Sequence, residues 1–407
     1  MKNNSVLLNA LFVIIAVLLI PARSSGTAVF PEYQQQKLGK SIPIAGNISQ
    51  LNHFFESLKN STKKKVRIAY FGDSIILGDV ITEYLRENFQ LKYGGAGVGL
   101  LPVIADDYRM RRTIYQTFSD DWTNSSIVLG NKEGFPLGIN GNCALPKAGS
   151  WVKYQGTEAT KTTGSFNLIR IFYSGADESS KLQYRLDNQN WQNLSLQSGS
   201  DLKESEINAV SNSRSVELKF ISGKAPYFYG VSLESKNPGV YIDNFPNRGN
   251  SGISLLDLQE KLLSQFNSYL DYDLVILHFG ANVAFPTTAG YKLYENKMID
   301  LVNYFRKIFS KAGLLLITVG DKTVKKGSQF VTDPEVSILL ETQNRIAQKA
   351  NIAIWNIWEV MGGKNSMVDW VNAAPPYALK DYSHFTNSGG ERVGNLLFDA
   401  LINASPK

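Results

Sequence analysis

Short apolar runs alternate with segments of helical period in two separate parts of this chain. Residues 66–71 form an apolar run that ends in Gly-Asp-Ser, and apolar residues at helical spacing follow over residues 80–89. After residue 239 the same pattern predicts strands at 240–243, 274–279, 314–319 and 352–355, and helices at 254–270, 291–311, 334–350 and from residue 388. Strands that alternate with helices predict a parallel sheet covered on both faces.

A different texture interrupts this alternation between the two parts. Runs of aromatic and β-branched residues are separated there by clusters of Gly, Asn, Asp and Ser, and in 181–186 apolar residues take every second place. This pattern is typical of an antiparallel β-sandwich. We therefore expect one discontinuous α/β domain, residues 25–106 and 236–407, with an all-β sandwich of residues 107–235 inserted into it.

The N-terminus carries an export pattern. Lys2 precedes an almost unbroken apolar run from Val6 to Ile20, and a proline and small residues follow. This order predicts a secretory signal peptide of residues 1–24, cleaved after Ser24. The alternative is a retained membrane anchor, although the run is shorter than the roughly 18–20 apolar residues that span a bilayer comfortably. We expect an exported protein, periplasmic or extracellular, with no stable membrane insertion after cleavage.

Composition excludes several kinds of site. The single cysteine, Cys143, excludes an intrachain disulfide framework and any Cys-rich metal cluster. Three histidines leave little material for a His-based metal centre. The net charge of +6 suits a polyanionic surface, but it is too small to argue for nucleic-acid binding, so no nucleic-acid partner is expected.

Four short polar segments lie at the ends of expected strands or just before the last expected helix. In chain order they are FGDS (71–74), NRGNSG (247–252), FGAN (279–282) and DYSH (381–384). Each of them alone is better explained as a turn or a helix cap. Together they fall where ligands bind in open α/β folds, at the carboxyl ends of parallel strands.

These segments supply every group that acyl transfer to a serine requires. The hydroxyl of Ser74 needs a base to take its proton, and the neutral imidazole of His384 suits that role. A carboxylate at Asp381 can fix the tautomer of that imidazole. The amide of Asn282, and a backbone N–H from the small-residue turn at 247–252, can donate hydrogen bonds to an oxyanion.

In these four blocks and in their order, the sequence resembles the SGNH (GDSL) hydrolase family. The resemblance covers roughly residues 65–106 and 236–407. It implies a three-layer α/β/α, flavodoxin-like fold with a parallel sheet, and a mechanism that needs no metal and no organic cofactor. The implied catalytic triad consists of Ser74, Asp381 and His384. The implied oxyanion hole consists of the N–H groups of Ser74 and Gly252 and the amide of Asn282, with Gly249 as the other candidate glycine.

A narrower resemblance is to the exported peptidoglycan O-acetylesterases of this family. They are similar in having a carbohydrate-binding-like β-sandwich after the first block, and a stretch like MGGKNSMVDW (361–370). They commonly have His-Thr after the nucleophile, where this chain has Ile75-Ile76. This departure bears on the substrate more than on the reaction class.

The resemblance favours a secreted carbohydrate esterase that removes O-acetyl groups from a polysaccharide, with peptidoglycan favoured. Two alternatives stay open: a glycan O-acetyltransferase with the same triad, and a glycan-binding protein whose α/β part is catalytically idle. On the insert, sugar rings could stack on Trp151, Trp191, Tyr227 and Tyr229, although aromatic residues in strands more often belong to the core. We expect His278, inside an apolar strand, to be a satisfied core histidine.

Overall fold

The structure is a computed structural model that describes residues 39–285 and 287–406. The predicted signal peptide, residues 1–24, lies outside the described residues. Within the described ranges, no helix is both long and apolar enough to cross a membrane.

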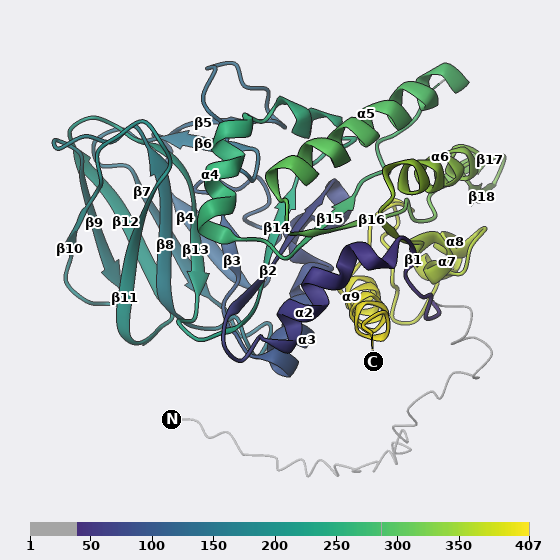
Figure 1. The fold of residues 1–407 in the computed structure, drawn as a ribbon, viewed down its shortest axis with the longest axis horizontal. Coiled ribbons are helices and arrows are strands. Elements are labelled where there is room, and N and C mark those ends of the chain that lie inside the picture. The colour runs from purple at the N-terminus through teal and green to yellow at the C-terminus, as the bar shows by residue number, and fades with distance from the viewer. Residues whose placement is uncertain (1–38, 286, 407) are drawn as a thin grey trace, which may run out of the picture.

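A six-stranded sheet forms the centre of the α/β part (Figure 1). Its order is β1-β19-β16-β15-β2-β14, and all strands are parallel except β1. The bounds are β1 Ala45–Gly46, β2 Lys65–Gly72, β14 Gly239–Pro246, β15 Leu274–His278, β16 Gly313–Ile317 and β19 Ala353–Trp355. Numbered along the chain, the parallel strands follow the spatial order 2-1-3-4-5, which is the flavodoxin-like order. The predicted α/β fold class is confirmed.

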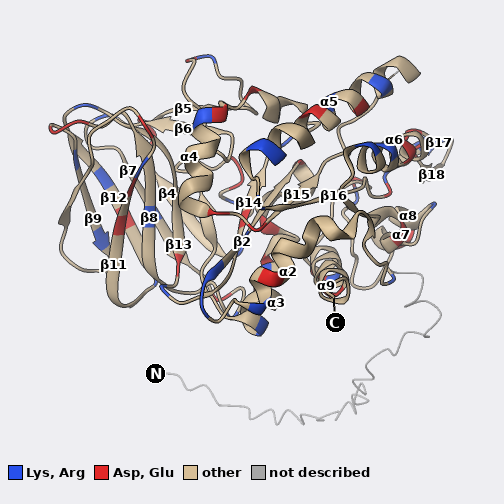
Figure 2. Cartoon of the chain, in the orientation of Figure 1, with Lys and Arg blue, Asp and Glu red and all other residues tan. Residues whose placement is uncertain are grey.

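Helices cover both faces of this sheet, because side chains alternate along its strands. In β2, Ile68 and Tyr70 pack into one apolar cluster, whereas Ala69 and Phe71 pack into the other. The first cluster includes residues of α2 (Asn52–Lys59), α3 (Thr82–Tyr93), α7 (Ile357–Met361), α8 (Ser366–Val371) and α9 (Asn387–Asn403). The second includes residues of α4 (Glu260–Leu270), α5 (Thr288–Ile308) and α6 (Glu335–Ala350). Charged residues lie mainly on the helices and loops. The central strands β15 and β16 contain no Lys, Arg, Asp or Glu (Figure 2).

Two antiparallel sheets form the inserted β domain, at the left of Figure 1. The first has the order β10-β9-β12-β7-β4, and the second has the order β11-β8-β13-β6-β5, with β3 also paired to β13. The first sheet comprises β4 Ile114–Phe118, β7 Trp151–Gly156, β9 Lys181–Leu186, β10 Gln192–Ser195 and β12 Ser215–Ser222. The second comprises β3 Gly99–Leu101, β5 Thr123–Ser126, β6 Asn142–Leu145, β8 Phe166–Ser174, β11 Lys203–Ser213 and β13 Tyr227–Glu234. The strand β3 therefore joins this sheet upstream of the domain boundary that we predict at residue 107.

The second sheet of the insert is buried on both faces along β8 and β13. Ile169 and Ile171 of β8 belong to the core between the two sheets of the insert. Phe172 points the other way, and the rings of Phe172 and Tyr229 each lie 5.6 Å from the ring of Phe266 on α4. The insert therefore shares an apolar core with the α/β part.

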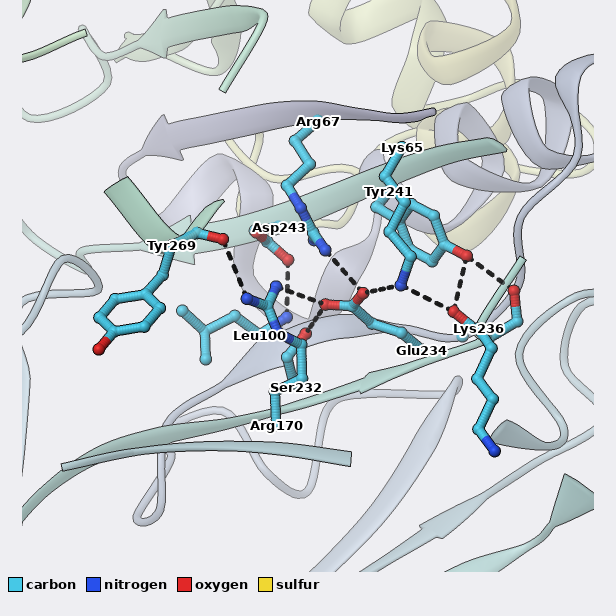
Figure 3. A network of polar contacts seen from close by, with 12 residues as sticks. Lys65, Arg67, Leu100, Arg170, Ser232, Glu234, Lys236, Tyr241, Asp243 and Tyr269 are labelled. Atoms are coloured by element: carbon cyan, nitrogen blue, oxygen red, sulfur yellow. Dashed lines mark hydrogen bonds and ion pairs between the residues drawn. The ribbon is translucent and has the colours of Figure 1, made fainter. Parts of the chain in front are cut away.

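A buried ion cluster also joins the insert to the central sheet (Figure 3). The carboxylate of Glu234 on β13 lies 2.7 Å from the cationic groups of both Lys65 and Arg67 on β2. Arg170 of β8 lies 3.5 Å from its other oxygen. Burial alone would raise the pKa of Glu234, but the three cations hold it well below its usual range. Removing one partner from such a buried pair typically costs about 3–5 kcal/mol, so this cluster firmly couples the two parts.

Two segments differ from the expectation. The predicted helix at 254–270 is broken: a 3-10 helix, η3 (Ile253–Asp257), ends at an extended Leu258, and α4 begins at Glu260. Leu255 and Leu258 are both buried, so the helical spacing continues across the break and conceals it. The pattern also did not predict the hairpin of β17 (Thr323–Lys326) and β18 (Gln329–Thr332), because most of its residues are exposed.

The four aromatic residues suggested as a sugar-stacking surface do not share one face. Trp151 lies on β7 of the first sheet, whereas Tyr227 and Tyr229 lie on β13 of the second. Tyr229 is buried, and the guanidinium of Arg185 lies 4.8 Å from the ring of Trp191. These four residues therefore do not form one stacking face, and the buried Tyr229 fits the alternative that aromatic residues in strands belong to the core.

Candidate active site

Ser74 lies directly after β2, at the start of a short 3-10 helix, η2 (Ser74–Asp79). The strand ends at Gly72, where a Cβ would come within 2.9 Å of a backbone oxygen of β15, so the close approach requires glycine. Asp73 caps η2, since its carboxylate accepts the N–H of Ile75 at 3.0 Å. The hydroxyl of Ser74 is thereby held at the carboxyl edge of the sheet, beside the point where the strand order reverses.

The structure brings Ser74, His384 and Asp381 into one line of hydrogen bonds. The His384 Nε2 lies 2.9 Å from the Ser74 Oγ, and its Nδ1 lies 2.9 Å from the Asp381 Oδ2. In the neutral imidazole that fits these contacts, Nδ1–H donates to the carboxylate and Nε2 accepts from the serine hydroxyl. The arrangement can therefore remove a proton from the serine as it attacks.

The carboxylate of Asp381 is held by the turn that carries it. Burial alone would raise its pKa, but the hydrogen bonds from the His384 backbone and side chain and from the Ser383 N–H lower it. The group is therefore ionised at neutral pH and can stabilise an imidazolium. The side chains of Asp381 and His384 are nevertheless 48% and 38% exposed, so this turn lies at the surface.

Ser74, Asp381 and His384 line a cleft of about 720 Å³. Its walls come from η2, from the turn after β14, from the turn after β15 and from the insert. Residues that line it include Ser74, Met110, Arg248, Gly249, Asn282 and His384. A cleft of this size has room for more than one acyl group and can take a larger molecule alongside it.

The structure treats the two candidate oxyanion glycines differently. The N–H of Gly252, which the sequence favours, already donates to the Asn250 Oδ1 at 2.7 Å. Gly249 lines the cleft, and among the described residues no atom lies within 4 Å of the position that a Cβ there would take. Asn282 also lines the cleft, and its Nδ2 has one long contact, 3.4 Å, to the Asn250 backbone oxygen. Gly249 thus lines the cleft, whereas the N–H of Gly252 can serve an oxyanion only by leaving Asn250.

Asp73 is a functional candidate to which the sequence reasoning gave no role. Besides capping η2, its Oδ2 accepts the N–H groups of Gly280 at 3.2 Å and Ala281 at 3.1 Å. It thereby ties the turn of Ser74 to the turn of Asn282. Burial raises its pKa to about 6, against the effect of the three backbone N–H donors. Its position within FGDS was the only signal in the sequence.

Asp79 holds the other end of η2. Its carboxylate lies 3.2 Å from Arg86 and 3.1 Å from Arg111, and all three side chains are buried. Arg111 also pairs with Asp107, which accepts the N–H of Gly78 at 2.9 Å. Burial alone would raise the pKa of Asp79, but Arg111 and Arg86 lower it to about 2. Asp107 and Arg111, from the region predicted as the insert, thus contact the nucleophile turn through Gly78 and Asp79.

The expectation for His278 is confirmed, and the structure also places Cys143. His278 is a buried core histidine whose Nδ1 lies 3.0 Å from the Tyr70 hydroxyl. Burial lowers its pKa to about 3, so the ring is neutral. Cys143 is a buried free thiol, and burial raises its pKa well above the usual range.

Comparisons with known proteins give one informative likeness. Neither protein-family models nor curated protein sequences match this chain. A solved structure of a peptidoglycan O-acetylesterase is similar with a TM-score of 0.72 at 20% identity, over 88% of this chain and 97% of that one. A family two carbohydrate esterase from Cellvibrio japonicus reaches a TM-score of only 0.29 at 9% identity, over 72% of this chain and 98% of that one.

At 20% identity the first likeness concerns the fold alone. It extends over both the α/β part and the two antiparallel sheets, because it covers 88% of this chain. The chain therefore shares the fold of that esterase, and in this chain the fold is a flavodoxin-like α/β domain with an inserted β domain.

Proposed function

We propose that this protein is a serine esterase that removes O-acetyl groups from a glycan, with peptidoglycan as the favoured substrate. The observation that carries the proposal is the hydrogen-bonded line from Asp381 through His384 to Ser74, at the wall of an open cleft. The fold likeness to a peptidoglycan O-acetylesterase supports the same reaction class. If residues 1–24 direct export as the sequence predicts, the reaction takes place in the periplasm or outside the cell.

In the first half of the reaction, the Ser74 Oγ attacks the acetyl carbonyl while the His384 Nε2 takes the hydroxyl proton. The carbonyl oxygen becomes an oxyanion, which we place between the Ser74 N–H, the Asn282 amide and a backbone N–H of the 249–252 turn. Donors already in position need no rearrangement, and losing one typically lowers turnover by about a hundredfold to a thousandfold. The intermediate collapses, His384 gives its proton to the departing sugar oxygen, and an acetyl-serine remains.

In the second half, a water molecule replaces the sugar. The His384 Nε2 takes a proton from this water, whose oxygen attacks the acetyl-serine carbonyl. The second oxyanion collapses, the Ser74 oxygen recovers its proton from His384, and acetic acid leaves and ionises to acetate in solution. Asp381 stays ionised throughout and stabilises the imidazolium that forms in each half.

A glycan that carries carboxylates suits Arg248, because Asp381, the carboxylate that lines the described cleft, is already paired with His384. Of the described residues that line it, Arg248 is the one Lys or Arg, and it is exposed next to Gly249. Peptidoglycan carries carboxylates on its peptide stems, and a guanidinium can bind a carboxylate through two parallel hydrogen bonds. We therefore favour an acetylated glycan that carries carboxylates over a neutral one.

Two alternatives use the same observations. An acetyltransferase would pass the acetyl group from Ser74 to a sugar hydroxyl instead of water, through the same triad. A glycan-binding protein would use the cleft without ester cleavage, but the complete hydrogen-bonded triad argues against an idle site.

The experiment that tests the proposal is acetate release from O-acetylated peptidoglycan, pectin and xylan by the wild-type protein and by Ser74→Ala. We expect release from peptidoglycan, and at least about a thousandfold loss in the variant. Acetylated product on added oligosaccharide, in place of free acetate, would favour the transferase. Equal rates for the wild type and Ser74→Ala would contradict the proposal.

A further inference from the structure

The turn that carries Asp381 and His384 has a strained residue at its centre. Tyr382 has a φ of +56°, a region that residues other than Gly, Asn and Asp rarely adopt. The turn closes through the Leu379 N–H, which donates to the His384 backbone oxygen at 2.8 Å. Because Tyr382 lies between Asp381 and His384, its backbone conformation sets the direction of both side chains. Such a conformation persists only where its surroundings hold it.

An aromatic stack from the hairpin β17–β18 holds this residue. The ring of Phe330 on β18 lies 3.9 Å from the ring of Tyr382, and the two planes are 15° apart. The Thr323 N–H, at the start of β17, donates to the Tyr382 backbone oxygen at 3.4 Å. The hairpin therefore contacts the strained residue through both a side chain and the backbone. Phe330 is the one aromatic residue of β17 and β18, and most residues of these two strands are exposed.

The hairpin is fastened at its base to the stretch MGGKNSMVDW, for which the proposed mechanism has no use. The Thr332 N–H donates to the Asn365 Oδ1 at 3.0 Å, and the Asn365 N–H donates to the Thr332 Oγ1 at 2.6 Å. Lys322 and Asp333, on either side of the hairpin, lie 3.3 Å apart. These contacts fix the direction in which the hairpin extends toward Tyr382.

The same stretch also supports the base of the catalytic turn. The backbone oxygen of Trp370 accepts the N–H groups of Tyr377 at 2.8 Å and Ala378 at 3.2 Å. The buried Trp370 ring lies 5.4 Å from the ring of Phe385. Residues 361–370 thus contact the residues on both sides of the catalytic turn directly. They support the turn itself through the hairpin.

We propose that the hairpin β17–β18 is a positioning arm, and that Phe330 is a positioning residue for the catalytic turn. Its stack on Tyr382 keeps Asp381 and His384 aligned on Ser74. This inference rests on the proposed esterase function, because it assigns a task to residues that act through the triad.

The test compares Phe330→Ala with the wild type on a small chromogenic acetyl ester, which is too small to reach the arm. We expect kcat to fall about tenfold, equivalent to about 1.4 kcal/mol, while KM stays within twofold. Phe330→Tyr retains the ring and should restore kcat to within twofold of the wild type. Hydrogen exchange at the His384 N–H, which donates to the Asp381 Oδ1 at 3.0 Å, should become faster in Phe330→Ala.

Val324→Ala is the matched control. Val324 lies on the same hairpin with the same 39% exposure as Phe330, but on the opposite face, because Phe330 pairs with Lys325. We expect this variant to keep the wild-type kcat. If Phe330→Ala keeps the wild-type kcat, or if Val324→Ala loses as much, the positioning role is refuted. A rise in KM for the glycan alone, with kcat unchanged, would make Phe330 a substrate contact and would also refute it.

Ser74→Ala separates this inference from the proposed function. If that variant is inactive while Phe330→Ala is fully active, only the arm fails. If Ser74→Ala retains the wild-type rate, the esterase proposal fails regardless of the result for Phe330.

Discussion

The two turns that meet at the Ser74–His384 hydrogen bond are held in different ways. The nucleophile turn, η2, begins after the buried carboxylate of Asp73 and ends at the buried carboxylate of Asp79. The catalytic turn at 379–384 lies at the surface, where backbone hydrogen bonds and one aromatic stack support it. The comparison suggests that damage to the first turn costs folding stability, whereas damage to the second costs activity in a protein that stays folded.

The largest expected effect is on activity and concerns the exposed turn. Asp381→Asn should lower kcat by on the order of ten-thousandfold, because the amide no longer fixes the tautomer that lets Nε2 accept the serine proton. The free energy of unfolding should stay close to that of the wild type, since the side chain is 48% exposed. Turnover of the chromogenic ester and urea unfolding of the same sample measure the two quantities. A loss in kcat below tenfold would remove Asp381 from the triad.

The next effect is on stability and concerns the buried turn. Asp79→Ala should lower the free energy of unfolding by about 3–5 kcal/mol, because it leaves Arg86 and Arg111 buried without their shared partner. Asp201→Ala removes an exposed ion pair with Lys261 and serves as the control, with no measurable change expected. Urea unfolding of both variants tests this. Equal stability of the two variants would mean that the buried cluster does not hold the turn.

The two carboxylates of the nucleophile turn should also respond to pH in opposite directions. The pKa of Asp73 is raised from 3.8 to about 6, so between these values the folded state binds more protons than the unfolded state. The free energy of unfolding should therefore fall as pH rises through this interval, by up to about 3 kcal/mol from this group. Asp73→Asn should flatten that part of the profile.

For Asp79, the pKa is lowered from 3.8 to about 2, and the sign reverses. Its contribution to stability is complete above pH 3.8 and is lost as the pH falls toward 2. Urea unfolding of the wild type and Asp73→Asn across this pH range measures both slopes. An unchanged profile in Asp73→Asn would contradict the raised pKa.

The smallest expected effect lies in the cleft between the two turns. Arg248→Gln should raise KM for acetylated pectin and peptidoglycan by about tenfold, because the bidentate contact with a carboxylate is lost. The kcat and KM for a neutral chromogenic ester should not change. Added salt should reduce the difference in KM between Arg248→Gln and the wild type on the anionic glycans. An equal loss on the neutral ester would assign Arg248 to the catalytic centre instead.

Much of the α/β part could be predicted from local pattern. Buried parallel strands are continuous apolar runs, so β2, β15, β16 and β19 were recognisable, and their alternation with helices implied the sheet. The break at Leu258 escaped detection because both sides of it are buried at helical spacing.

The site could be predicted only as far as strand ends and short motifs identify it. Ser74, Asp381, His384 and Asn282 follow from these signals, and the structure places all four at one cleft. The contact of Asp73 with Gly280 spans 207 positions of sequence, and no local pattern carries such a pairing. The use of the Gly252 N–H by Asn250, and the stack of Phe330 on Tyr382, likewise depend on the folded arrangement.

Labelling with a fluorophosphonate, a reagent that reacts with activated serines, tests the central claim most directly. The account predicts one covalent adduct, on Ser74, located by mass spectrometry of the digested protein. It also predicts that His384→Ala abolishes this adduct, because the hydroxyl then has no base. An adduct on another residue, or equal labelling of the wild type and His384→Ala, would contradict the account.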